Sequence, residues 1–131
     1  MIFVDSNVPM YLVGAAHPNK DRTISVLTRL TQSGTTLVTD IEVYQEILHR
    51  YAAIGRLDAI EPAFASLDAI VDDVLAFGVA EVRAARTLLE SVTGLSARDA
   101  LHTAVMTNAG VTRIFSFDSG FDAVGGLDRL S

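Results

Sequence analysis

The chain has 131 residues, of which half are hydrophobic and 20% are charged, so it fits one folded domain over 1–131 and excludes a disordered chain. It contains no cysteine, which excludes disulfides and thiolate metal sites, and its net charge of −6 excludes RNA binding by bulk positive charge alone. Neither a basic leader before Asp5 nor an uncharged apolar run of about 18 residues is present, so we expect a cytoplasmic protein without membrane contact.

Short strand-like segments alternate with longer helical segments along the chain. The first half is predicted to form a strand over 1–4, a short helix over 7–13, a helix over 18–33, a strand over 35–39 and helices over 41–54 and 57–69. The second half is predicted to form an edge strand or extended connection over 70–77, helices over 79–92 and 96–109, a strand over 112–117 and a last short strand within 121–131. This order predicts a three-layer α/β/α domain around a mainly parallel sheet of four or five strands.

The apolar positions of the middle helices leave one question open. In the helix over 57–69, four apolar residues are expected to face inward: Leu57, Ile60, Phe64 and Leu67. Positions such as Val43, Ile54, Phe64 and Leu67 belong either to the core or to a groove for a partner protein, because periodicity does not separate these alternatives.

Two acids follow predicted strands that are far apart in the sequence. Asp5 comes directly after the strand at 1–4, and Asp118 follows the strand at 112–117. If both strands are central and parallel, their carboxylates emerge at the same edge of the sheet, where α/β proteins bind ligands. The alternative for each is a structural turn or cap, since Asp-Ser-Asn and Asp-Ser-Gly are common turn sequences.

The helix over 41–54 carries two acids four residues apart, and they receive different interpretations. Thr39 and Glu42 match a capping box, which gives Glu42 a structural role. Glu46 lies in mid-helix beside apolar residues, where a carboxylate is costly unless it is paired or binds a cation. His49 or Arg50 is the alternative, purely structural partner of Glu46.

Asp99 lies in the first turn of the helix over 96–109. Ser96 and Asp99 match a capping signature, and the helix dipole favours an acid in this turn, so capping alone accounts for Asp99. The same position at the sheet edge also suits a carboxylate that points at a metal ion. Arg98 beside it is either solvated or a phosphate contact.

Carboxylates that converge in one pocket favour hard divalent cations. Mg²⁺ and Mn²⁺ prefer carboxylate oxygens and water, and one or two such ions activate water and stabilise charge at phosphate. His17, His49 and His102 show no metal-ligand spacing, and the chain has no Gly-rich phosphate loop, G-x-S-x-G elbow or H-E-x-x-H motif. The residues therefore predict a metal-bound acidic pocket.

Four segments, spread over nearly the whole chain, carry a family resemblance: IFVDSN, VYQEILHRY, SARDALHTAVM and FSFDSGFD. In these segments the chain resembles the PIN-domain ribonucleases and, among them, the VapC-type toxins of bacterial toxin–antitoxin pairs. The resemblance implies hydrolysis of RNA phosphodiester bonds with Mg²⁺ or Mn²⁺, inhibition by a small cognate antitoxin, and homodimerisation.

The resemblance also implies roles for individual residues. The catalytic, metal-binding quartet corresponds to Asp5, Glu46, Asp99 and Asp118, an additional metal-binding acid to Asp122, and supporting polar positions to Asn7 and Ser116. The closing motif lacks the basic residue that often follows its first Asp, so phosphate contacts are expected to fall on Arg98, on Arg113 or on the dimer surface that is free of antitoxin.

Two alternatives remain beside the nuclease. A haloacid-dehalogenase-like phosphatase also places acids after strands, but it needs a second Asp where this chain has Asn7, and Lys20 is the only lysine. A non-catalytic RNA- or protein-binding scaffold of the same fold would more readily have lost one of the four acids.

Overall fold

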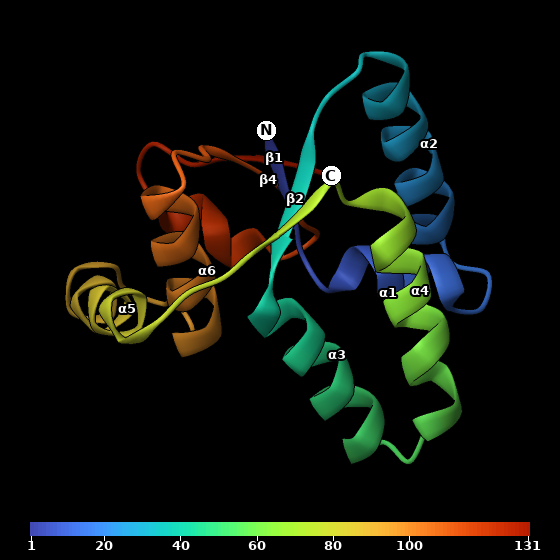
Figure 1. Cartoon of the computed structure of the whole chain (residues 1–131), viewed down its shortest axis with the longest axis horizontal. Helices are drawn as coiled ribbons and strands as arrows, with labels where there is room; N and C mark the ends of the chain where they lie inside the picture. The colour runs from blue at the N-terminus through green and yellow to red at the C-terminus, as the bar shows by residue number, and fades with distance from the viewer.

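The structure, a computed structural model that describes residues 1–131, is built on a five-stranded sheet in the order β3-β2-β1-β4-β5 (Figure 1). All neighbouring strands are parallel. The strands are β1 (Ile2–Val4), β2 (Leu37–Asp40), β3 (Asp73–Leu75), β4 (Arg113–Phe115) and β5 (Asp128–Leu130). The predicted parallel sheet of four or five strands is thus confirmed, and the ambiguous segment 70–77 contains the edge strand β3.

Helices cover both faces of the sheet and complete the predicted three layers (Figure 1). On one side lie α1 (Asn7–Val13), α2 (Pro18–Gln32), α3 (Ile41–Ala53) and α4 (Ile60–Ile70). On the other side α5 (Val79–Ser91) packs against α6 (Ala97–Asn108), and two 3₁₀ turns, η1 (Leu57–Ala59) and η2 (Ser119–Ala123), complete the chain. None of the helices combines the length and the apolarity needed to cross a membrane.

The central strand β1 determines where a ligand site can form. Phe3 pairs with Val38 of β2 on one side and with Ile114 of β4 on the other. The chain passes from β1 outward through β2 and β3 and returns through β4 on the opposite side, so the order of strands reverses between β1 and β4. In open parallel sheets such a reversal opens a crevice at the carboxyl ends of the two strands.

The core surrounds β1, whose three residues are fully buried, as expected of a strand covered on both faces. The main apolar cluster contains 19 buried residues from the sheet and the helices of both layers. A smaller cluster joins α5 to α6 through Ala85, Leu95, Ala100 and Ala104. The carboxyl edge of β1 therefore rests on a close-packed base.

The helix predicted over 57–69 differs from the structure at its start. Residues 57–59 form the separate turn η1, and α4 begins at Ile60, which places Pro62 in the first helical turn, where its missing N–H is tolerated. Leu57 consequently faces solvent, with 68% of its surface exposed, and the prediction that it faces inward is wrong. Ile60 and Phe64 are half-buried, whereas Leu67 is fully buried.

The open question about the apolar positions also receives an answer. Val43 and Leu67 belong to the core. Ile54 is 67% exposed at the end of α3, so it is free to contact a partner.

Candidate active site

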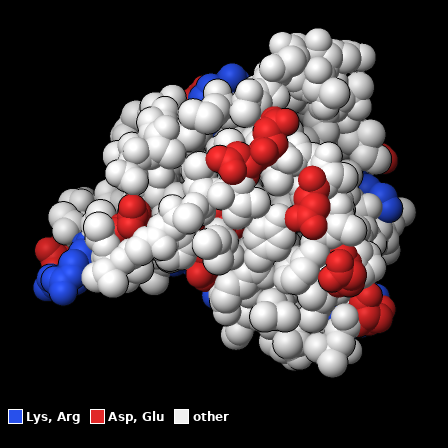
Figure 2. All heavy atoms as spheres, in the orientation of Figure 1, with Lys and Arg blue, Asp and Glu red and all other residues white.

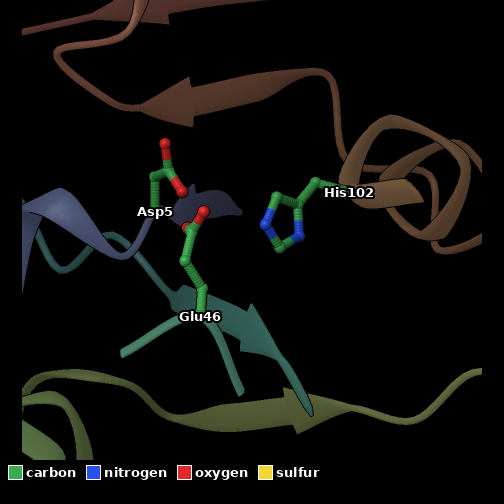
Figure 3. A group of neighbouring side chains, drawn as sticks. All are labelled: Asp5, Glu46 and His102. Carbon is green, nitrogen blue, oxygen red and sulfur yellow. The ribbon is translucent and has the colours of Figure 1, made fainter. Parts of the chain in front are cut away.

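The four acids singled out in the sequence lie at the carboxyl edge of the sheet, carried by four different elements. Asp5 follows β1, Glu46 lies on α3, Asp99 is in the first turn of α6 and Asp118 precedes η2. Asp5 and Glu46 meet His102 of α6 in a group whose potential ligand atoms lie within 4.8 Å of one another. Figure 3 shows the three side chains pointing toward a common centre.

Asp5 is buried, and its hydrogen bonds hold both carboxylate oxygens in place. The Ser6 N–H donates to Oδ1 at 2.7 Å, while the Ser116 hydroxyl donates to Oδ2 at 2.6 Å and the Asn7 amide to the same oxygen at 3.4 Å. The Ser116 hydroxyl also accepts from the Asp118 N–H at 3.0 Å. The predicted supporting residues Asn7 and Ser116 thus lie beside the acids and connect the end of β1 to the segment after β4.

Asp99 and Asp118 form the second half of the acidic group, with a carboxylate oxygen of each beside Gly120. The Ser96 hydroxyl accepts from the Asp99 N–H at 3.1 Å, so the predicted cap exists and uses only the backbone of Asp99. A methyl group on Gly120 would lie 3.0 Å from Asp118 Oδ1 and 3.5 Å from Asp99 Oδ2. Glycine therefore leaves room for the two carboxyls.

Burial, and to a smaller extent neighbouring carboxylates, raises the pKa values of two of the acids. Burial raises the pKa of Asp5, and the charge of Glu46 adds to this rise, against the opposing effects of His102 and of hydrogen bonds from Ser116 and Ser6. Burial and the charges of Asp118 and Asp5 raise the pKa of Asp99 to about 7. A group that holds protons this strongly gains most from a divalent cation, which would neutralise the carboxylates and let them ionise.

Glu46 is held by residues other than the two expected from the sequence. Its Oε1 accepts from the Ser6 hydroxyl and its Oε2 accepts from Arg98 Nη1 at 3.1 Å. Neither His49 nor Arg50 pairs with it. Arg98 thus joins α6 to the acids of α3, and with 31% of its side chain exposed its role as a phosphate contact stays a prediction.

The predicted capping box of Thr39 and Glu42 is wrong. The strand β2 extends one residue beyond Thr39, whose hydroxyl donates to the Val4 carbonyl at 2.9 Å. Asp40 instead caps α3, with its Oδ1 accepting from the Val43 N–H at 3.0 Å. Glu42 accepts from Arg98 Nε at 3.2 Å, so its role is an ion pair.

Two further residues that were expected at the site, Asp122 and Arg113, lie outside the acidic group. Asp122 is not brought into it: Arg129 donates to both of its oxygens, at 2.8 and 2.9 Å, and the Asp122 side chain is 55% exposed. Arg113 begins β4, so it lies at the opposite edge of the sheet, and it pairs with Asp128 at 3.7 Å. The basic residue near the acids that sequence reasoning missed is Arg129, which donates to the Ser116 carbonyl at 3.1 Å.

His102 and Asp40 are the other residues that the sequence reasoning missed. Both side chains are fully buried, and His102 Nδ1 lies 2.7 Å from Asp40 Oδ2. Burial lowers the pKa of His102, but the hydrogen bond to Asp40 and the charges of Asp40, Asp5 and Glu46 outweigh burial and raise the pKa to about 9. The available signal was spacing, because His102 lies three residues after Asp99 and so shares its helix face.

Comparisons with known proteins identify the family of the chain. A family model described as PIN domain matches residues 2–127. Ribonuclease VapC13 of Mycobacterium tuberculosis is 52% identical over 131 residues, which is 100% of both chains, and Ribonuclease VapC23 of the same species is 40% identical over 118 residues, 90% of this chain and 93% of that one. The crystal structure of the Mycobacterium tuberculosis toxin VapC20, which cleaves the sarcin-ricin loop, covers 95% of each chain with a TM-score of 0.72 and 23% identity, a likeness of fold.

Proposed function

The chain belongs to the PIN-domain family, and we propose that it is a metal-dependent endoribonuclease of the VapC type, folded as one domain over residues 1–131. The observation that carries the proposal is the convergence, at one edge of the sheet, of the four acids that match the family's catalytic quartet: Asp5, Glu46, Asp99 and Asp118. The full length and 52% identity shared with Ribonuclease VapC13 support RNA as the substrate.

The residues at this edge fit a site for Mg²⁺ or Mn²⁺. The donor set is made of carboxylate oxygens, which hard cations prefer, and burial, with a smaller contribution from neighbouring carboxylates, raises the pKa values of Asp5 and Asp99. Asp5 and Glu46 would hold a cation on one side of the group, and Asp99 and Asp118 on the other. Asp122 is left out of this site, because Arg129 occupies both of its oxygens. A cation bound there supplies Lewis-acid activation of water and neutralises charge at the phosphate.

Hydrogen bonds from neighbouring side chains hold two of the acids in fixed orientations. Ser116 and Asn7 fix the orientation of the Asp5 carboxylate, and Arg98 fixes that of Glu46. Preorganised groups of this kind contribute to catalysis because they need no rearrangement when charge develops in the transition state.

The charge of the surface bears on how RNA is held. On the face drawn in Figure 2, acidic side chains are spread over the surface and basic ones lie mainly toward its margins. Such a face offers RNA no continuous basic track, in keeping with the net charge of −6. Cations bound by the acids would hold phosphate at this edge, where Arg98 pairs with Glu46 and Arg129 donates to the Ser116 carbonyl.

The proposal includes two protein partners and a location. We expect a small cognate antitoxin, a second copy of the chain and action in the cytoplasm, where RNA substrates are found. Apolar residues exposed on α5, namely Val79, Val82 and Leu89, and Ile54 and Leu57 between α3 and α4 offer surface for such contacts. Solved structures that share the fold include VapBC2 from Rickettsia felis, with a TM-score of 0.68. Light scattering of the purified chain tests the dimer.

Cleavage assays test the nuclease directly. The protein, purified free of any partner, is incubated with structured RNAs in Mn²⁺ or Mg²⁺, with and without EDTA. Cleavage is expected only with the cation, and D5N and D99N are expected to abolish it while circular dichroism shows an intact fold. The matched control is D122N, which removes an acid outside the group and should retain cleavage. Full activity in EDTA, or in D5N and D99N, would overturn the proposal. A protein that neither cleaves RNA nor binds a cation would be a non-catalytic scaffold.

A further inference from the structure

One polar atom of the core has no partner within the protein. His102 Nε2 is the only buried side-chain nitrogen or oxygen that makes no hydrogen bond. Its side chain is fully buried, and the ring points toward Asp5 and Glu46 (Figure 3). Leaving a buried polar atom unsatisfied costs about 1–3 kcal/mol, so an unpartnered nitrogen at this place calls for a ligand.

The other ring nitrogen, Nδ1, is held by the carboxylate of Asp40. His102 Nδ1 lies 2.7 Å from Asp40 Oδ2, and Asp40 is itself held through Oδ1 by the Val43 N–H at 3.0 Å. Since a carboxylate accepts, Nδ1 carries a proton, and Nε2, which faces the two acids, is the nitrogen that can supply a lone pair when the ring is neutral. A histidine that donates its second N–H to a carboxylate is the usual arrangement of a metal-ligating histidine.

We propose that His102, oriented by Asp40, supplies a nitrogen ligand through Nε2 to the cation held by Asp5 and Glu46. This inference rests on the proposed function, because it concerns the same acidic site. The three donor atoms already lie within 4.8 Å of one another. Ligands of one cation are separated by about 3–4.4 Å when metal–ligand bonds are about 2.0–2.2 Å, so small side-chain movements complete the group.

The nitrogen changes which cations the site prefers. A site made only of carboxylate and water suits Mg²⁺, whereas an imidazole favours transition metals, whose affinities rise from Mn²⁺ toward Cu²⁺. The site should therefore bind Mn²⁺ with higher affinity than Mg²⁺.

Electron spin echo envelope modulation of the Mn²⁺-loaded protein tests the ligand directly. The untagged protein carries H17N and H49Q, which replace two exposed histidines and leave His102 as the only one. Nitrogen modulation from a coordinated imidazole is expected, and its frequencies should change when histidine is labelled with ¹⁵N. This measurement needs no change at His102 itself.

Calorimetry of variants gives the second readout. D40N should weaken Mn²⁺ binding about 10–100-fold, as loss of an outer partner of a ligating histidine does, and should change Mg²⁺ binding little. H102Q should also remove the preference for Mn²⁺, while H49Q is the matched control with unchanged affinities. Mn²⁺ binding without nitrogen modulation, and without loss of affinity in D40N, would show that His102 is only a counter-ion to the acids and would overturn the inference alone. Absence of any Mn²⁺ binding would overturn the inference together with the metal-dependent function.

Discussion

Replacing Asp99 by Asn should stabilise the cation-free protein at neutral and alkaline pH. The folded protein raises the pKa of Asp99 from 3.8 to about 7, so in this interval the folded state keeps a proton that the unfolded chain has lost. The free energy of unfolding therefore falls as the pH rises through the interval, and the loss is complete above about pH 7. An asparagine has no proton to lose, so D99N avoids this loss.

The size of the effect follows from the same pKa. A rise from 3.8 to about 7 corresponds to about 4 kcal/mol at most. Water and salt that reach this edge of the sheet screen the charges of Asp118 and Asp5, which reduces the gain to about 1–2 kcal/mol. In a chain of this length, that gain corresponds to a melting temperature higher by roughly 3–10 °C at pH 8.

Thermal unfolding in EDTA at pH 4 and pH 8 measures the difference between D99N and the unchanged protein. The difference should be large at pH 8 and nearly absent at pH 4, and Mn²⁺ at pH 8 should reduce it, because a cation removes the repulsion from the unchanged protein. D122N is the matched control: Arg129 lowers the pKa of Asp122, so this variant should lose stability at pH 8. Equal melting temperatures for D99N and the unchanged protein at pH 8 would refute the reasoning.

Three other substitutions test the packing and bonding around the acids. Gly120→Ala places a methyl 3.0 Å from Asp118 Oδ1, so cleavage and Mn²⁺ affinity should fall about 10–100-fold with an unchanged circular dichroism spectrum; unaltered calorimetric affinity would show that the carboxyl moves aside freely. Ser116→Ala leaves a buried Asp5 oxygen without its hydroxyl donor and should lower the unfolding free energy in urea by about 1–3 kcal/mol; a neutral result would mean that water replaces the hydroxyl. Glu42→Gln should lower the free energy of unfolding by about 0–1 kcal/mol and keep cleavage of RNA, whereas Glu46→Gln should abolish cleavage. Loss of cleavage in Glu42→Gln alone would show that Glu42, and not Glu46, belongs to the site.

The layers of the fold could be read from the sequence because their signals are local. The run of residues 1–4 is apolar throughout, as a central parallel strand must be, and the helices show their own spacing. The edge strand β3 was ambiguous because two of its three residues, Asp73 and Val74, are exposed and carry no core pattern. The boundary at Leu57 was wrong because helical spacing does not detect a short 3₁₀ turn before a proline.

The acids of the site were predictable for the same reason, but their partners were not. Asp5 and Asp118 follow strands, and strand direction alone brings them to one edge. The contacts of Glu46 with Arg98 and of His102 with Asp40 join residues 52 and 62 positions apart, which only the folded chain brings together. Capping rules also failed at Thr39, because β2 continues by one residue and Asp40 takes over the cap.

The central position of β1 determines when the acidic group can exist during synthesis. The first strand receives its second neighbour only from β4, and the Ser116 hydroxyl reaches Asp5 across 111 residues of chain. Ribosomes deliver the N-terminal part first, at about 5–20 residues per second, and contacts between distant segments are the slowest to form. A nascent chain therefore carries Asp5 without Ser116, Asp99 or Asp118. The acids come together only when almost all of the polypeptide has been made, so the unfinished protein has no assembled centre with which to attack the RNA around it.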